Sequence, residues 1–236
     1  MLILAIDTAL DACAAAVLDT GTSKVIAIES QAMKRGHAEA LMPLVARVMK
    51  QSAVPFAALD RIAVTTGPGS FTGLRVGLSA ARGIALASGK PVVGLTTLSA
   101  YAAPIVSEGG DQPVISAIDA RHDHVYLQVV SGHGSSLVRP KVASIEEALA
   151  ASRFGAPHLL GNAANILADR WPPDAPPPFK VDAQPAPDIT WVAWLGAAVN
   201  PETAPAKPYY LRAPDAKPSQ DAKPSQSATP AASAAS

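Results

Sequence analysis

The chain has 236 residues with 19 Lys or Arg and 19 Asp or Glu, so its formal net charge is zero. Proteins that bind nucleic acid unaided usually show a basic excess or stripe, and this chain shows neither. One cysteine, Cys13, excludes an internal disulfide and fits a reducing compartment. No apolar run approaches the roughly 20 residues that span a bilayer, and Asp7 and Asp11 interrupt the apolar start, so we expect a cytoplasmic protein without a membrane partner.

The first part of the chain predicts three strands and then a one-sided helix. Residues 2–7 and 13–19 are short apolar runs joined by the polar turn TALDA, which is typical of a hairpin, and residues 24–30 alternate as a third strand. In the helix expected over 37–51, the apolar residues recur at helical spacing and form one stripe. This stripe consists of Leu41, Leu44, Val45, Val48 and Met49.

A glycine-rich joint links the next strand to the next helix. Residues 61–66 predict a buried strand, and the sequence GPGS follows directly. Ser70 is a natural N-cap for a helix over 70–88, and Gly89 is a natural stop. The elements expected next are a strand over 91–95 and a helix over about 96–107.

The residues of the joint exclude three familiar motifs. A Walker loop requires a glycine five positions after the first and then Lys, but Thr72 stands five positions after Gly67 and no Lys follows. The dinucleotide fingerprint also fails at Thr72. The nucleophile pattern G-x-S-x-G fails because Pro68 and Thr72 flank Ser70 where glycines are required. Gly67 and Gly69 instead indicate a sharp turn from strand to helix.

The pattern then restarts. The segment ISAID, which ends at Asp119, repeats ILAID, which ends at Asp7, and a polar turn and a strand follow each segment. Such internal similarity indicates a duplicated unit. We therefore expect an α/β fold of two actin-like, ribonuclease-H-like lobes, the architecture of actin, sugar kinases and heat-shock chaperones. The first lobe is expected over 1–108, and a shortened, degenerate second lobe over 109–212.

The last segment differs in composition from the rest. Residues 213–236 have no aromatic residue, have alanine as their only aliphatic residue, and repeat DAKPSQ. Such a segment buries too little apolar surface to offset the entropy lost on ordering. We expect 213–236 to be a disordered tail.

In lobes of this architecture the paired hairpin turns hold the phosphates of ATP. Turns that surround a phosphate need glycines, so that backbone N–H groups can approach its oxygens. Neither the turn after Asp7 nor the turn after Asp119 contains one. The two aspartates are either turn-forming remnants or organisers of Mg²⁺. The candidate residues of this degenerate nucleotide cleft are Asp7, Thr8, Asp119 and Gly161.

Several segments resemble one family. Residues 65–100, from TTGPGSFTGLR to LTTLSA, resemble the signature of the TsaB family, the partner subunit in synthesis of threonylcarbamoyladenosine in tRNA. The motif H-x-x-x-L-x-P at 37–43, AIDAR at 117–121 and PYYLR at 208–212 also resemble this family. The resemblance covers about residues 1–212.

The resemblance implies a non-catalytic dimerisation or scaffold subunit. In the family it pairs with the catalytic paralogue TsaD and the small ATPase TsaE, which modify the adenosine 3′ to the anticodon. TsaD carries its metal on two histidines, and the corresponding positions here are Thr97 and Tyr101, neither of which replaces imidazole as a ligand. We therefore expect no catalytic residue, no metal ligand and no cofactor in this chain alone. ATP or ADP and the metal would belong to the assembled complex, and tRNA would be reached through it.

The resemblance also implies an interface. The helices expected at about 36–51 and 70–88 would form a four-helix bundle with the same pair of TsaD, or a homodimer when the chain is alone. The apolar stripe of the first helix is either this interface or ordinary core, and His37 is either part of it or a polar residue at a helix end. The expected interface residues are His37, Leu41, Leu44, Val45, Val48, Thr72, Gly73, Leu74, Gly77, Ala80, Ala81 and Ile84.

Two other functions stay open from the residues alone. An ATP-dependent phosphotransferase of the actin-like class is disfavoured by the missing turn glycines, and a glycoprotease-like metallopeptidase by the missing histidine pair. His122 and His124 could bind a metal or belong to a solvated hairpin. Tyr209, Tyr210 and Arg212 are expected to tie the end of the folded region back onto the domain.

Overall fold

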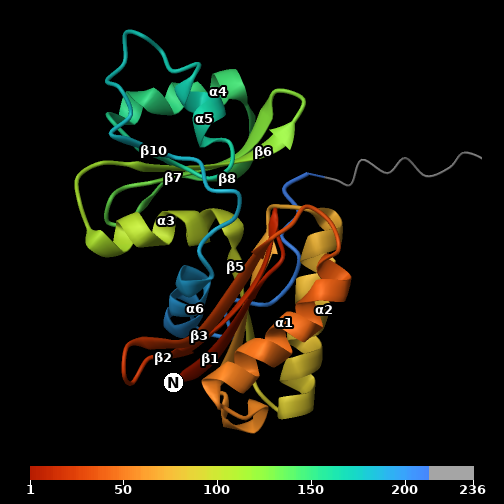
Figure 1. Cartoon of the computed structure of the whole chain (residues 1–236). Coiled ribbons are helices and arrows are strands. Elements are labelled where there is room, and N and C mark those ends of the chain that lie inside the picture. Colours follow the sequence, from red (N-terminus) through yellow and green to blue (C-terminus); the bar gives the residue numbers. More distant parts are fainter. Residues whose placement is uncertain (213–236) are drawn as a thin grey trace, which may run out of the picture.

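The structure, a computed structural model, describes residues 1–212, so the tail expected to be disordered, 213–236, lies outside the described residues. It contains two five-stranded sheets, one in each lobe (Figure 1). In the first sheet the order is β3 (Lys24–Ala32), β2 (Ala12–Asp19), β1 (Leu2–Asp7), β4 (Arg61–Gly67) and β5 (Val92–Thr96). In the second it is β8 (Ser136–Ser144), β7 (His124–Val130), β6 (Val114–Arg121), β9 (His158–Leu160) and β10 (Lys180–Asp182).

The two sheets have the same topology. In each, three antiparallel strands form a meander, and two further strands run parallel to its first strand. The last two strands of the second sheet have three residues each, so the second copy is the shorter one. The predicted duplicated α/β architecture is confirmed.

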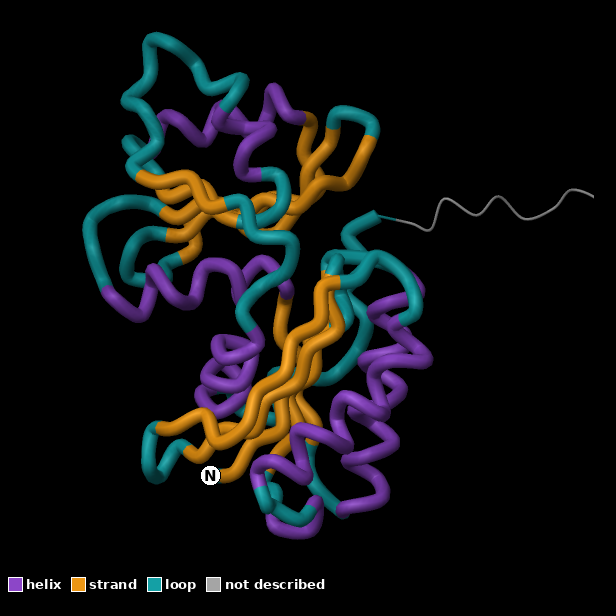
Figure 2. The backbone as a smooth tube through the Cα atoms, in the orientation of Figure 1, coloured by secondary structure: helices purple, strands orange, loops and turns teal. Residues whose placement is uncertain are grey.

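The helices cover both faces of each sheet (Figures 1 and 2). The helices α1 (His37–Ser52) and α2 (Phe71–Ser88) lie on one face of the first sheet, and α6 (Ile189–Ala198) lies on the other. In the second lobe α3 (Thr97–Glu108) packs on the face nearer α6, and α4 (Ile145–Leu149) and α5 (Ala164–Ala168) pack on the opposite face. Within residues 1–212, no helix combines the length and apolar character needed to cross a membrane. The remaining helical turns are η1 (Phe56–Ala58) and η2 (Ala150–Phe154).

Local signals set the ends of α2 as predicted. The side chain of Ser70 accepts a hydrogen bond from the Gly73 N–H at 3.3 Å, which caps the helix start. Gly89 has a φ of 65° and ends the helix in the left-handed region, where glycine has no Cβ to oppose it.

The apolar stripe of α1 faces the first sheet. Leu41, Leu44, Val45 and Val48 are at most 1 % exposed and belong to the core between α1, α2 and the sheet. Their assignment to a partner interface is wrong, because a helix has one wide apolar stripe and this face of the sheet needs it as cover. In α2, Leu74 and Ala81 are buried in the same way, whereas Ala80 and Ile84 are only half-buried and Thr72 is exposed.

The chain returns to the first lobe after the second sheet is complete. The residues of α6 fall within the range predicted for the second lobe, 109–212. The helix nevertheless contacts β1, β2 and β4 of the first sheet. Its end is held by Arg61, whose Nη1 donates to the carbonyls of Gly196 and Val199, each at 2.7 Å. An almost wholly apolar helix must be buried, and the second face of the first sheet is the surface that it covers. Whether 1–108 and 109–212 fold as separate domains stays a prediction.

Core variants on α1 test this packing. We expect Leu44→Ala to lower the free energy of unfolding by about 2–5 kcal/mol, because it leaves a cavity. Met42→Ala on the same helix, where the side chain is 48 % exposed, should change it by less than about 0.5 kcal/mol. Urea unfolding followed by circular dichroism measures both, and Leu44→Glu should not yield a soluble folded protein. A soluble, cooperatively folding Leu44→Glu would contradict the assignment of this residue to the core.

Candidate functional site

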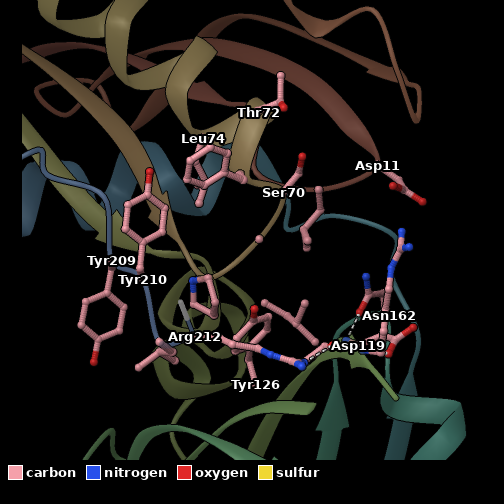
Figure 3. A pocket seen from close by; sticks show the side chains of 18 residues that line it. Asp11, Ser70, Thr72, Leu74, Asp119, Tyr126, Asn162, Tyr209, Tyr210 and Arg212 are labelled. Atoms are coloured by element: carbon pink, nitrogen blue, oxygen red, sulfur yellow. Dashed lines mark hydrogen bonds between the residues drawn. The ribbon is translucent and has the colours of Figure 1, made fainter. Parts of the chain in front are cut away.

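A polar cavity of about 500 Å³ lies between the two lobes (Figure 3). Its walls come from the β1–β2 turn, the glycine joint and start of α2, the β6–β7 turn, the loop after β9, and residues 209–212. Figure 3 shows Asp119 and Asn162 close together, with Tyr209 and Tyr210 on the opposite side of the cavity. The site therefore combines groups from both lobes and from the end of the described chain.

The glycines of the joint allow α2 to approach the β1–β2 turn. A Cβ at Gly69 would lie 2.3 Å from the carbonyl oxygen of Ala9, and one at Gly73 would lie 2.1 Å from that of Thr8. A Cβ at Gly77 would lie 2.4 Å from Thr8 Oγ1. Contacts this short exclude any side chain. Gly73 and Gly77 are thus filled by this chain's own turn, and their assignment to a partner interface is wrong.

The turn directs its carbonyl groups at neighbouring segments. The Ala9 carbonyl accepts from the Ser70 N–H at 2.7 Å, and the Asp11 carbonyl accepts from the Met33 N–H at 3.0 Å. Between them, the Leu10 carbonyl lies 3.0 Å from His37 Nε2. His37 is only 8 % exposed, so it holds the turn and does not form part of an exposed interface.

Asp7 and Thr8 lie behind the cavity wall. Both are buried and neither lines the cavity, which corrects their assignment to the nucleotide cleft. Thr8 Oγ1 donates to the Gly73 carbonyl at 2.7 Å. Asp7 Oδ1 accepts from Thr65 Oγ1 at 2.5 Å and from the Ala9 N–H at 3.0 Å, and Oδ2 has no partner within residues 1–212. Burial raises the pKa of Asp7, and the hydrogen bonds from Thr65 and Ala9 oppose this rise.

The second turn does face the cavity. The Asp119 N–H donates to Asn162 Oδ1 at 2.8 Å, and Asp119 Oδ1 accepts from the Arg121 N–H at 2.7 Å. Gly161 supports this arrangement with a φ of 100°, and a Cβ there would lie 2.2 Å from the carbonyl oxygen of Ala117. Asp119 thus lines the cavity, and its role in a nucleotide cleft stays a prediction; its partner Asn162 is the residue of the 161–163 loop that lines the cavity.

The histidines beside this turn do not share one face of a strand. His122 lies in the turn with a φ of 52°, and His124 begins β7, with its Nδ1 2.6 Å from the His122 carbonyl. Asp123 pairs with Arg170 at 3.2 Å. In the described part of the chain, no group of three or more His, Cys, Asp or Glu side chains could hold a metal ion.

An aromatic pair at the cavity was missed by the sequence analysis. The rings of Phe71 and Tyr210 lie 5.5 Å apart, and the Arg75 guanidinium lies 3.8 Å from the centre of the Phe71 ring. Phe71 stands in the quoted signature and Tyr210 in PYYLR, but only the fold brings these two segments together. Tyr209 and Arg212 tie the chain end back as expected: the Tyr209 N–H donates to the Thr66 carbonyl, and Arg212 Nη1 to the Ala120 carbonyl.

The positions that correspond to the TsaD metal ligands are packed between the lobes. Thr97 and Tyr101 are at most 4 % exposed, and the Tyr101 hydroxyl donates to the Gln184 carbonyl at 2.8 Å. Burial raises the pKa of Tyr101, and the charges of Asp7 and Asp11 add to this rise.

A second candidate surface is an apolar groove of about 650 Å³ on the outer side of α1 and α2. A Cβ at Gly83 would meet no atom within 4 Å, so the middle of the groove is open. Met42 is an apolar residue of α1 that lies outside its buried stripe. An apolar residue at such a position is the feature of the sequence that could have indicated the groove. The outer groove is lined by Met42, Phe56, Ala57, Ala80, Gly83, Ile84, Ala87 and Ser88.

Comparisons with known proteins agree with this architecture. Residues 24–180 match the model of the family described as TsaD, tRNA N6-adenosine threonylcarbamoyltransferase. The chain is 36 % identical to the tRNA threonylcarbamoyladenosine biosynthesis protein TsaB of Escherichia coli, over 53 % of each chain. It is 35 % identical to an uncharacterized protein of Mycobacterium bovis over 92 % of this chain and 94 % of that one.

A solved structure shows the same fold. The structure of YeaZ from Pseudomonas aeruginosa is 29 % identical in sequence, with a TM-score of 0.71 over 89 % of this chain and 99 % of that one. The chain spans about half the length of the curated relatives named TsaB from Escherichia coli and Haemophilus influenzae, at 53 % and 56 %.

The buried carboxyl group of Asp7 predicts a pH effect on stability. Because its pKa is raised in the folded state, the unfolded chain loses this proton first as the pH rises above about 4. The contribution of Asp7 to stability therefore falls as the pH rises towards the raised pKa. Asp7→Asn removes this ionisation, so its free energy of unfolding relative to the natural chain should increase as the pH rises above about 4.

Urea unfolding at a series of pH values measures this difference. Asp174→Asn, in an exposed loop, is the matched control and should follow the natural chain at every pH. Parallel pH profiles for Asp7→Asn and the natural chain would show that Asp7 does not titrate in this way.

Proposed function

Because this chain belongs to the TsaB (YeaZ) family, we propose that it is a non-catalytic scaffold subunit in the synthesis of threonylcarbamoyladenosine in tRNA. It pairs with the catalytic paralogue TsaD and, together with the ATPase TsaE, takes part in modifying the adenosine 3′ to the anticodon. The names of its TsaB relatives and the match of residues 24–180 to the TsaD model support this pathway.

The outer groove is the observation that carries the scaffold role. Leu86 beside it is 86 % exposed, and Met42 and Phe56 are also exposed apolar side chains. Exposed apolar patches of this kind mark interaction surfaces. A paralogue of the same fold has the same pair of helices, so the two pairs can pack as a four-helix bundle. When the chain is alone, a second copy covers the groove and forms a homodimer.

Two features of the site support a subunit without chemistry of its own. Asp7, which would organise Mg²⁺ in an active relative, is buried behind the glycine joint. Thr97 and Tyr101 occupy the places of the histidine ligands, and neither side chain replaces imidazole. ATP or ADP and the metal therefore belong to the assembled complex, and tRNA is reached through it. The metal content and ATP turnover of the isolated chain test the phosphotransferase and metallopeptidase alternatives.

Substitutions in the outer groove test the interface. We expect Met42→Glu and Gly83→Arg to lower the affinity for TsaD by about 100-fold or more, since each buries an unpaired charge and Gly83→Arg also forces the helices apart. Both positions are exposed, so circular dichroism should show unchanged folding. Analytical ultracentrifugation measures the pairing. Leu137→Glu, an exposed leucine on β8, is the matched control. If both groove variants pair as tightly as the natural chain, the interface lies elsewhere.

Reconstitution tests the absence of catalysis. Supplied with threonine, bicarbonate, ATP, tRNA and the adenylate-forming enzyme, the isolated chain should produce no modified nucleoside. Addition of TsaD and TsaE should restore it, as measured by mass spectrometry of digested tRNA. Modified tRNA formed without TsaD would refute the scaffold role.

A further inference from the structure

The interlobe cavity has a pair of tilted aromatic rings at one side. Phe71 and Tyr210 both line it and are 38 % and 43 % exposed, although they pack against each other. Arg75 lies over the Phe71 ring, so a cation already ends this short stack. Exposed stacks of aromatic rings and guanidinium groups bind the π-face of an unpaired nucleobase.

The opposite side offers hydrogen-bonding groups of both kinds (Figure 3). Asp119 uses Oδ1 for the Arg121 N–H, and Asn162 uses Oδ1 for the Asp119 N–H. Within residues 1–212 this leaves Asp119 Oδ2 as an acceptor and Asn162 Nδ2 as a donor without a hydrogen-bond partner. A carboxylate and an amide placed side by side match the paired hydroxyl groups of a ribose.

A cation stands beside this pair. Arg121 lines the cavity, and its guanidinium forms no ion pair or hydrogen bond within residues 1–212. Its φ of 62° is unfavourable for a residue with a Cβ, and such strain is concentrated at functional sites. A guanidinium at this place can bind one phosphate group through paired N–H donors.

The cavity has no cradle for further phosphates. The β1–β2 turn, which would supply it, carries no glycine and gives its Ala9, Leu10 and Asp11 carbonyls to neighbouring segments. Its Asp7 is buried behind the joint and cannot reach a magnesium ion in the cavity. The geometry therefore favours a ligand with one phosphate over a magnesium-bound triphosphate.

We propose that the interlobe cavity binds one ribonucleotide unit, with its base on Phe71 and Tyr210, its ribose on Asp119 and Asn162, and its single phosphate on Arg121. The volume of about 500 Å³ is within the range of small-molecule sites. This unit is either a free nucleoside monophosphate or an unpaired nucleotide of RNA. An RNA nucleotide as the ligand rests on the proposed role in tRNA modification, whereas a free nucleoside monophosphate does not.

Calorimetric titration of the full-length protein tests the site. The probes are adenosine 5′-monophosphate, ATP with and without Mg²⁺, an RNA hairpin with an unpaired loop, and the stem of that hairpin as a closed duplex. Adenosine monophosphate should bind at least as tightly as ATP, and Mg²⁺ should not improve ATP binding. If the source is RNA, the hairpin should bind and the duplex should not.

Variants locate the binding. Tyr210→Ala should weaken adenosine monophosphate binding about 10-fold or more, because base stacking is lost. Arg121→Ala should weaken the binding of adenosine monophosphate more than the binding of adenosine, which has no phosphate. Tyr210→Phe keeps the ring and should bind as the natural chain does. Phe179→Ala removes an aromatic ring that is 62 % exposed and does not line the cavity, and serves as the control.

Several results would overturn the proposal. These are no binding of either adenosine monophosphate or the hairpin, equal effects of Tyr210→Ala and Phe179→Ala, or a magnesium-dependent preference for ATP. Failure here is separable from failure of the scaffold role, because Phe71 and Gly83 are about 18 Å apart along α2. Tyr210→Ala should therefore pair normally with TsaD, and the groove variants should bind adenosine monophosphate normally.

Discussion

The close contact between the β1–β2 turn and the start of α2 is the constraint on which the arrangement of the site depends. Gly69 and Gly73 leave no room for a side chain against the carbonyls of Ala9 and Thr8. Two hydrogen bonds then hold the turn against the helix start. The Ser70 N–H donates to the Ala9 carbonyl, and Thr8 Oγ1 donates to the Gly73 carbonyl. With the helix start held there, Phe71 lies at the cavity and the far end of α2 extends along α1. A residue with a Cβ at either glycine would displace the helix and both surfaces together.

This contact also explains why the cleft lacks the usual phosphate-binding turn of an actin-like lobe. A backbone turn can present its polar groups either to a ligand or to the protein. Here the carbonyls after Asp7 are bonded to Ser70, His37 and Met33. Asp7 is consequently part of the core, where burial raises its pKa, whereas Asp119, at the equivalent place in the second lobe, remains at the cavity. The duplicated turns have thus diverged in what they face, although the surrounding strands have the same order.

The α1–α2 layer shows how one pair of helices can serve a core and a surface. The sheet takes the wide apolar stripe of α1, including Leu44 and Val48. What remains outside is a narrower set of small or flexible apolar residues, such as Met42 and Gly83, which form the outer groove. Small residues on an exposed helix face allow another helix to approach closely, and methionine adapts to irregular contacts. The proposed partner surface is therefore the weaker apolar signal of the layer.

The order of strands and helices up to about residue 107, the duplication around Asp7 and Asp119, and the caps Ser70 and Gly89 were determined by the sequence alone, because each depends on local periodicity, spacing or turn chemistry. The signature of the glycine joint was equally visible. The tertiary structure decided which side of each apolar stripe is covered, so Leu41, Leu44 and Gly77 proved internal and Met42 and Gly83 external. It also decided that α6 returns to the first sheet and that Tyr210 meets Phe71. Periodicity shows that a helix has an apolar face, but what covers that face depends on contacts between residues far apart in the chain.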